Sequence, residues 1–257
     1  MAVTIPRAAV DFLTEEINGI SADAQARVLE VLRGIQWTPE NVAQCRDLVI
    51  QALAAVMPTY TTMAAQASAD FYDAARELAV GERLGAQAIS DFDMRKTEGA
   101  VRGFVRFVLD GRVDTFNDQV LQRIDYEMKR SANMSVVENG RRDPKSVRYA
   151  RVPTGAETCD FCLMLASRGF VYQSESTASA SHVHSHCDCR VTPGWDGMEV
   201  EDYDPRSIYD RWQDAIDAKA KERAERNGTT ASEERAAIMA AYGRAAKNAK
   251  RAGRKSA

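Results

Sequence analysis

The side chains that could bind a metal gather in one short stretch of this sequence. Four of the five cysteines and all three histidines fall between residues 159 and 189. A first pair forms a CxxC motif, and the others follow in a tight group: Cys159 and Cys162, then His182, His184, His186, Cys187 and Cys189. Thiolate and imidazole are ligands that zinc prefers, and a CxxC turn directs two sulfurs at one point. The spacing therefore predicts a zinc site that joins two stretches of the chain.

The candidate ligands outnumber the four places of a tetrahedral zinc site. We expect the ligands to come from Cys159, Cys162, His184, Cys187 and Cys189, with His182 and His186 in reserve. A zinc ion with four protein ligands has no open position for water, so the predicted ion supports folding and does no chemistry. The neighbouring carboxylates, Asp160 and Asp188, are expected to solvate or orient the site.

Other interpretations of the cysteines remain open at this point. They could be buried and reduced without a metal. A redox CxxC would lie at a helix start in a parallel α/β unit, which the flanking sequence does not predict. A catalytic zinc would need three protein ligands and a nearby carboxylate.

Composition and charge narrow the class of protein. The chain has 257 residues, of which 45% are hydrophobic and 28% charged, as is ordinary for a folded protein. Its net charge of -3 does not favour binding of nucleic acid by the whole chain. The N-terminus lacks a signal-peptide pattern, and no apolar run approaches the roughly 18 to 20 residues that cross a bilayer. We therefore expect a protein of the reducing cytosol without a membrane partner, in which the isolated Cys45 is buried.

Apolar residues three and four apart predict a helical region over residues 1–144. The helices are expected at 6–18, 21–34, 38–57, 60–80, 98–109 and 113–138. Ser21 is predicted to cap the second helix, and Pro58 to lie just beyond the end of the third. The charged residues of the last helix, between Asp125 and Arg130, are expected on a solvated face, and Asn139–Gly140 is expected to end it.

Residues 145–196 predict a small mixed domain built around the metal. Short strands are expected at 147–153, 170–172 and 190–192, with a short helix at 163–166 and a polar loop at 173–182. Some fifty residues make a small core, and a bound ion would compensate for that. Residues 197–257 begin with an acidic linker, Glu199 to Asp204, and continue as two helices at 205–226 and 231–250. The expected fold is mainly α, with a small α+β zinc-binding domain.

The end of the chain is basic, with no acidic residue after Glu234. Its positive charges are Arg244, Lys247, Lys250, Arg251, Arg254 and Lys255. This pattern fits a solvated tail, and it also fits weak binding to the phosphate backbone of packaged DNA.

Motifs for other chemistry are absent from the sequence, which has no glycine-rich phosphate loop, GxSxG or HExxH. We therefore expect a protein that is not an enzyme. The alternative is a zinc-stabilised nuclease or other DNA-processing enzyme with His182 or His186 as general base. Such an enzyme would need a second, hard-metal site with carboxylates nearby.

Between Tyr149 and Val191 the sequence acquires a specific family resemblance. It is carried by Arg151-Val152-Pro153-Thr154-Gly155, Thr158-Cys159-Asp160-Phe161-Cys162, Leu165-Ala166-Ser167-Arg168-Gly169 and the His-x-x-Cys-x-Cys element from His184 to Cys189. These strings resemble the Mu F-like minor head proteins of tailed bacteriophages, particularly of phages that infect actinobacteria. Those proteins often carry an arginine between the final cysteines, where this chain has Asp188.

The resemblance implies a minor capsid protein that acts in head morphogenesis. Such a protein is assembled in the host cytoplasm and lies in the virion, inside the capsid and near the portal. Its partners would be the portal protein and the major capsid or scaffold protein, contacted by the helical region, with packaged DNA at the basic tail. Residues 197–257 are too few for a separate catalytic domain, which favours the plain minor capsid form.

Overall fold

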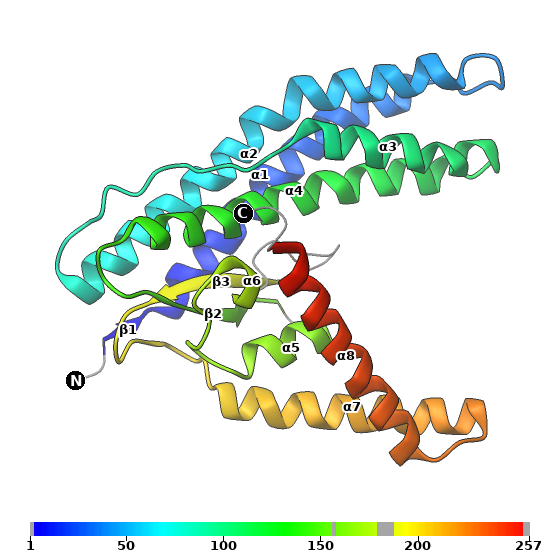
Figure 1. Ribbon diagram of the computed structural model, residues 1–257. Coiled ribbons are helices and arrows are strands. Elements are labelled where there is room, and N and C mark those ends of the chain that lie inside the picture. Colours follow the sequence, from blue (N-terminus) through cyan, green and yellow to red (C-terminus); the bar gives the residue numbers. More distant parts are fainter. Residues whose placement is uncertain (1–2, 156–157, 179–187, 254–257) are drawn as a thin grey trace.

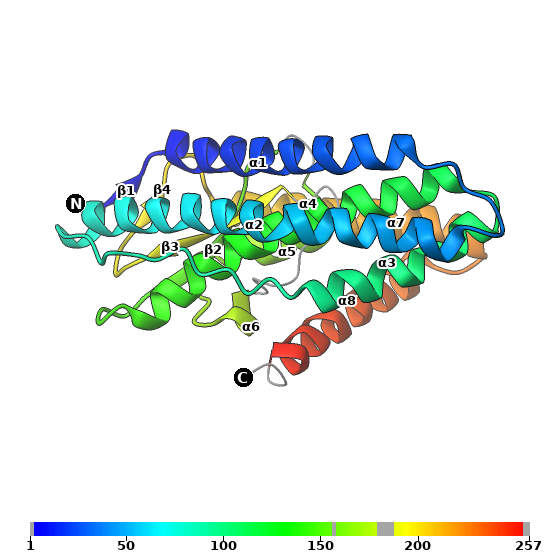
Figure 2. The ribbon, with the colours of Figure 1, turned by 90° about the horizontal axis from the view of Figure 1, so that it is seen from above.

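The computed structural model describes residues 3–155, 158–178 and 188–253. Four long helices form a bundle: α1 (Arg7–Gly34), α2 (Val42–Val80), α3 (Met94–Leu109) and α4 (Val113–Arg142). α2 and α4 pack along each other, and α1 and α3 lie on opposite sides of α2 (Figure 2). Their apolar stripes meet in a buried core that includes Val28, Leu53, Val101 and Ile124. The predicted helical character of this region is confirmed.

α1 is one continuous helix and does not restart at Ser21, so the predicted N-cap is wrong. Ser21 is buried, and its hydroxyl lies 3.1 Å from a carboxylate oxygen of Asp125 on α4. A serine in a helix interior can hydrogen-bond outward to a neighbouring element, and here that element is α4.

α2 continues through Pro58, where the sequence predicted an end. Pro58 and Ala54 are both exposed, so water can bind the Ala54 carbonyl that loses its helical donor. The buried stripe runs on from Leu53 and Met57 to Thr61, whose hydroxyl donates to the Met57 carbonyl at 2.9 Å. Packing of this stripe outweighs the tendency of proline to end a helix.

α2 also corrects the expectation that no apolar stretch of the chain is long enough to cross a bilayer. One 18-residue window in it has a mean hydropathy of 1.4, so by length and composition only the helix could cross a membrane. Core helices of globular proteins pass the same test. In this fold α2 packs against α1, α3 and α4, and 33% of that window is buried.

The charged residues of α4 between Asp125 and Arg130 are buried or half-buried, although the sequence predicted a solvated face. Glu127 and Lys129 are only 2% and 6% exposed. Lys129 Nζ lies 2.7 Å from a carboxylate oxygen of Asp125, and Arg123 donates to Glu127. Burial raises the pKa of Glu127, while the nearby arginines act in the opposite direction. These residues are enclosed because α1, α2, α3 and the sheet all pack against α4.

α4 also runs through Asn139–Gly140, where a break was predicted. The Asn139 side chain is fully buried, and it accepts from the Gln87 N–H at 2.9 Å and donates to the Gln87 carbonyl at 2.8 Å. Gly140 faces Tyr149, whose hydroxyl oxygen would lie 1.9 Å from a Cβ at this position. This asparagine–glycine pair therefore serves packing and not a turn.

The end of α4 is tied to α2 by a buried ion pair. The Asp143 carboxylate accepts from Arg76 Nε and from the Tyr72 hydroxyl, each at 2.8 Å. Burial alone would raise the pKa of Asp143, but these hydrogen bonds and one from the Lys145 N–H outweigh it and lower the pKa.

Two small sheets of two strands each accompany the bundle. β2 (Arg148–Pro153) pairs antiparallel with β3 (Cys189–Gly194), and β1 (Thr4–Ile5) pairs in parallel with β4 (Glu199–Val200). The strands predicted at 147–153 and 190–192 are thereby confirmed. Of the strand predicted at 170–172, Tyr172 forms an isolated bridge with Tyr149.

Short helices cover the sheet. α5 (Asp160–Ala166) packs on β2, which confirms the helix predicted at 163–166. In the described part of the predicted polar loop, residues 173–178, the sequence predicted no helix, but α6 (Glu175–Ala178) is a short one. Helices α2 and α4 cover β3.

The C-terminal helices were predicted correctly. α7 (Pro205–Asn227) packs on α5, and α8 (Ala231–Gly253) packs on α7 and α6. In Figure 1, the β2–β3 sheet and α5 lie between the bundle and this helix pair. The exposed acidic linker contains β4, and its Asp204 caps α7 by accepting from the Arg206 N–H at 2.9 Å.

One hydrophobic core connects the three predicted segments. Val10 of α1, Val191 of β3 and Ile216 of α7 all belong to it. The pairing of β1 with β4 also joins the first described residues to those that precede α7. The proposed boundaries near residues 144 and 197 stay a prediction.

Candidate metal centre

Three of the predicted ligands converge where α5 and β3 begin. Cys159 is the N-cap residue of α5, and its sulfur accepts from the Cys162 N–H at 3.4 Å. Cys189 is the first residue of β3, and its Sγ lies 3.1 Å from Cys162 Sγ. Cys162 and Cys189 are 1% and 0% exposed, and the half-buried Cys159 packs against them. Two sequence segments are thus brought together through their sulfurs.

The other predicted ligands, His184 and Cys187, lie outside the described residues, as do His182 and His186. The donor set that is described fits a soft-metal site because buried, closely spaced sulfurs are what zinc binds best among protein groups. Ligand atoms of Cys162, Asp188 and Cys189 all lie within 4.8 Å of one another.

The two neighbouring carboxylates make contacts that agree with the expected orienting role. Asp188 Oδ2 accepts from the Thr158 hydroxyl at 2.7 Å and from the Gly155 N–H at 3.2 Å, which ties Thr158 and Gly155 to the residue before β3. Asp160 Oδ2 lies 3.0 Å from Lys219 Nζ on α7 and accepts from the Tyr242 hydroxyl on α8 at 3.2 Å. One carboxylate therefore supports the ligand loop, and the other holds the C-terminal helices against α5.

Sequence reasoning missed Arg151, which is 0% exposed and directs its guanidinium at the sulfur of Cys189. Its Nη2 and Nε lie 2.8 and 3.3 Å from Cys189 Sγ. The alternating pattern of this segment predicted a half-buried strand, but both faces of the sheet are covered. Arg190, on the opposite face, is also buried and donates to Thr14 and Asn18 of α1. The alternation of apolar and polar residues in a strand does not show whether its polar face is covered as well. The one available signal was that Arg151 belongs to the strings that resemble the Mu F-like proteins.

Two tyrosines hold α5 in place beside the cysteines: the buried Tyr172 and the half-buried Tyr242. The Tyr172 hydroxyl donates to the Leu165 carbonyl at 2.7 Å, and burial raises the pKa of Tyr172 to about 12. Burial, followed by the nearby Asp160 carboxylate, also raises the pKa of Tyr242. Both hydroxyls therefore keep their protons at neutral pH and remain hydrogen-bond donors.

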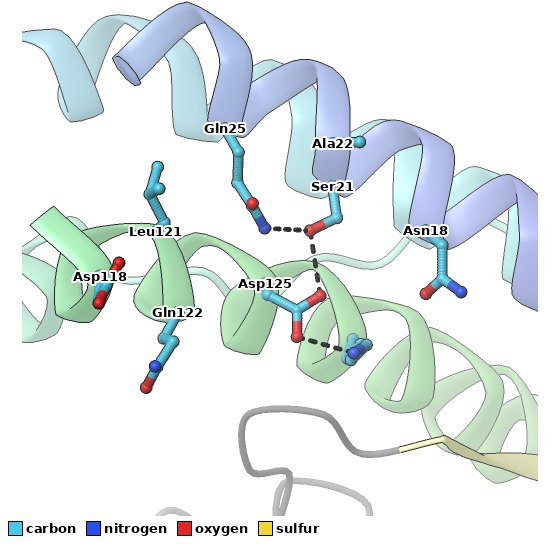
Figure 3. A pocket seen from close by; sticks show the side chains of 9 residues that line it. Asn18, Ser21, Ala22, Gln25, Asp118, Leu121, Gln122 and Asp125 are labelled. Atoms are coloured by element: carbon cyan, nitrogen blue, oxygen red, sulfur yellow. Dashed lines mark hydrogen bonds and ion pairs between the residues drawn. The ribbon is translucent and has the colours of Figure 1, made fainter. Parts of the chain in front are cut away.

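A separate polar cavity of about 450 Å³ lies between α1 and α4 (Figure 3). The lining residues that are labelled there are Asn18, Ser21, Ala22, Gln25, Asp118, Leu121, Gln122 and Asp125. Lys129 also lines the cavity and neutralises Asp125, and none of the described cysteines contributes to it. The cavity is therefore distinct from the sulfur cluster.

Two predictions away from the cluster have different outcomes. Cys45 is half-buried and not buried as predicted, and it lies in the first turn of α2. Of the basic tail, Arg244 is exposed on α8, whereas the side chains of Lys247, Lys250, Arg251, Arg254 and Lys255 lie outside the described residues. DNA binding by this tail stays a prediction.

Comparison with known proteins identifies the chain's relatives. The family model described as VG15 protein matches residues 4–215, which include the bundle, the cysteines and the start of α7. The Gene 15 protein of Mycobacterium phage D29 is 28% identical over 193 residues, which are 59% of this chain and 68% of that protein. No solved structure matches. These similarities indicate a phage protein, and phage proteins are made in the cytoplasm of the host. The chain belongs to the VG15 protein family.

Proposed function

We propose that this protein is a minor capsid protein of a tailed phage that acts in head morphogenesis. It lies inside the procapsid, associates with the portal and is not an enzyme. The proposal is supported by the phage relatives, by the helical bulk of the chain and by the Mu F-like strings around the cysteines. The observation that carries it is the contact between the buried Cys162 and Cys189, with the half-buried Cys159 packed against them, where α5 meets β3.

The proposed zinc is structural. Cys159, Cys162 and Cys189 would supply sulfur ligands, and the remaining ligand would come from the predicted pair His184 and Cys187. When bound, the ion supplies a cross-link between two segments and no reaction. A site closed by protein ligands fits a particle component better than a hydrolase, because it leaves no place for an activated water.

The proposed partners are the portal protein and the major capsid or scaffold protein. We assign these contacts to the α1–α4 bundle because it presents large apolar side chains to solvent. Phe12 and Leu109 are 67% and 70% exposed, and Leu48 and Met63 of α2 are each nearly half exposed. Packaged DNA would be contacted by the basic end of α8 and the residues after it.

The experiment is quantitative mass spectrometry of purified procapsids and mature virions from the phage that encodes this chain. A minor capsid protein should be present in both at a few copies per portal ring, whereas the major capsid protein is present in hundreds. A deletion phage, complemented in trans, should yield few or defective heads without the gene. If the chain is missing from both particles and heads form normally, the proposal fails.

A DNA-nicking assay distinguishes the proposed structural role from the alternative nuclease function. Purified protein is incubated with supercoiled DNA and magnesium, beside variants His182→Ala and His186→Ala. Intact DNA in every lane agrees with a structural protein. Nicking that one of these substitutions abolishes would favour the nuclease.

A further inference from the structure

Arg151 is buried against the cysteine cluster, and the pairing of β2 with β3 places it there. Pro153 lies directly opposite Cys189 in the β2–β3 register, and residues two apart on a strand share a face. Arg151 therefore lies diagonally across from Cys189 on the same face of the sheet. Its Nη2 and Nε both point to one sulfur, at 2.8 and 3.3 Å.

Charge explains why an arginine is suited to this position. Zn²⁺ with three thiolates carries a net charge of -1, and burial of an uncompensated charge is unfavourable. Arg151 is 0% exposed and carries +1, so it is itself unfavourable without an anion. Placed together, the guanidinium offsets the net negative charge of a three-thiolate centre, beside which the Asp188 carboxylate adds a further negative charge. The planar fork of arginine also donates two charge-assisted hydrogen bonds, which a lysine cannot reproduce.

We propose that Arg151 is the counter-ion and positioning residue of the metal centre: it holds the Cys189 sulfur toward Cys162 and balances the charge of the bound ion. This inference rests on the proposed zinc site and deepens it.

Zinc affinity is the measurement that tests this role. The full-length protein is titrated with Zn²⁺ against a chromophoric chelator, and Co²⁺ is used as a spectroscopic probe of thiolate ligation. Arg151→Met removes the charge, and Arg151→Lys keeps the charge but loses the fork. We expect about 10–100-fold weaker zinc binding for Arg151→Met, the usual effect of losing a partner of a metal ligand, and a smaller loss for Arg151→Lys.

Arg76 supplies the matched control. It is also buried, at 2% exposure, and ion-paired, but its partner is Asp143 at the end of α4. Arg76→Lys and Arg76→Met should lower thermal stability and leave zinc affinity and the Co²⁺ spectrum unchanged. If Arg151→Met does not fold, the two lysine variants still provide the comparison.

Each outcome decides the matter. Weaker zinc binding in the Arg151 variants alone supports the proposal. Wild-type affinity in both Arg151 variants overturns it and leaves the zinc site intact, and an equal loss in the Arg76 variants also overturns it by assigning the effect to general destabilisation. Wild-type protein that binds no zinc refutes the site and this inference together, whereas the virion analysis tests the capsid role separately.

Discussion

Replacement of Gly140 by alanine is a sharp test of how α4 meets the sheet. Alanine in place of a glycine within a helix normally stabilises a protein by about 0.5–1 kcal/mol. Here the new Cβ would lie 1.9 Å from the Tyr149 hydroxyl oxygen and 2.9 Å from Tyr149 Cζ. Real Cβ atoms do not approach other atoms so closely, and therefore either Tyr149 or the helix must move.

The magnitude follows from how firmly Tyr149 is held. The ring is 2% exposed, and its hydroxyl donates to the Val137 carbonyl at 3.2 Å. Forcing extra atoms into a packed core destabilises it by about 1–3 kcal/mol. The helix-propensity gain offsets part of this, so we expect a net loss of about 1–2 kcal/mol. For a chain of this size that corresponds to a melting temperature lower by about 2–8 °C.

The assay is urea denaturation followed by circular dichroism, with Gly103→Ala as the control. Gly103 is an exposed glycine inside α3 with no atom within 4 Å of its would-be Cβ. That substitution should stabilise the protein by about 0.5–1 kcal/mol, so the two glycine-to-alanine changes should have opposite signs.

A double-mutant cycle with Tyr149→Phe locates the clash. Removing the hydroxyl eliminates the closest contact with the new methyl group, so the second substitution should recover part of the loss. Coupling of at least about 0.5 kcal/mol is expected for groups in contact. Additive effects, or a Gly140→Ala variant as stable as the Gly103→Ala variant, would refute this account of the packing.

Three further predictions concern the metal and the ion pairs. A strong chelator should lower the melting temperature, and added Zn²⁺ should restore it, because ligand binding to the folded state alone stabilises that state. Asp143→Asn should remove a pH dependence: the wild-type pair stabilises the fold above the unfolded pKa of about 3.9, and this contribution is lost as the pH falls toward the lowered folded pKa. The difference between wild type and variant should shrink below about pH 4 in denaturation curves. Asp160→Ala should weaken the attachment of α7 and α8 to α5 by removing the contacts to Lys219 and Tyr242. Because Lys219 is partly exposed, the free energy of unfolding should fall by at most about 1 kcal/mol. Limited proteolysis should therefore become faster, while the zinc content stays unchanged.

Helices and short strands were predictable here because periodicity reports which face of an element is buried. The positions of α7, α8, β2 and β3 follow from that signal. The breaks at Ser21, Pro58 and Gly140 were wrong because local propensity is worth about 1 kcal/mol for most residues and about 3 kcal/mol for an interior proline. A long buried stripe contributes more than that, and an exposed proline on the outer side of α2 leaves the stripe intact.

The second error in the sequence-based predictions was the exposure expected for charged residues that are in fact buried or half-buried. The residues between Asp125 and Arg130 have the spacing of a solvated face, and so has Arg151 within its strand. Their burial depends on partners that lie far away in sequence, such as Cys189 for Arg151. A pattern along one element contains no information about what packs on its second side.

The candidate centre shows how the two kinds of information combine. Cysteine spacing indicates a cross-link between two segments, but it leaves open what else faces the sulfurs. The register of β2 and β3 then determines that Arg151 shares a face with Cys189, and its buried guanidinium donates to that sulfur. A protein sulfur is anionic when it binds a metal, so the buried arginine is a physical reason, independent of ligand spacing, to expect a charged thiolate centre at the junction of α5 and β3.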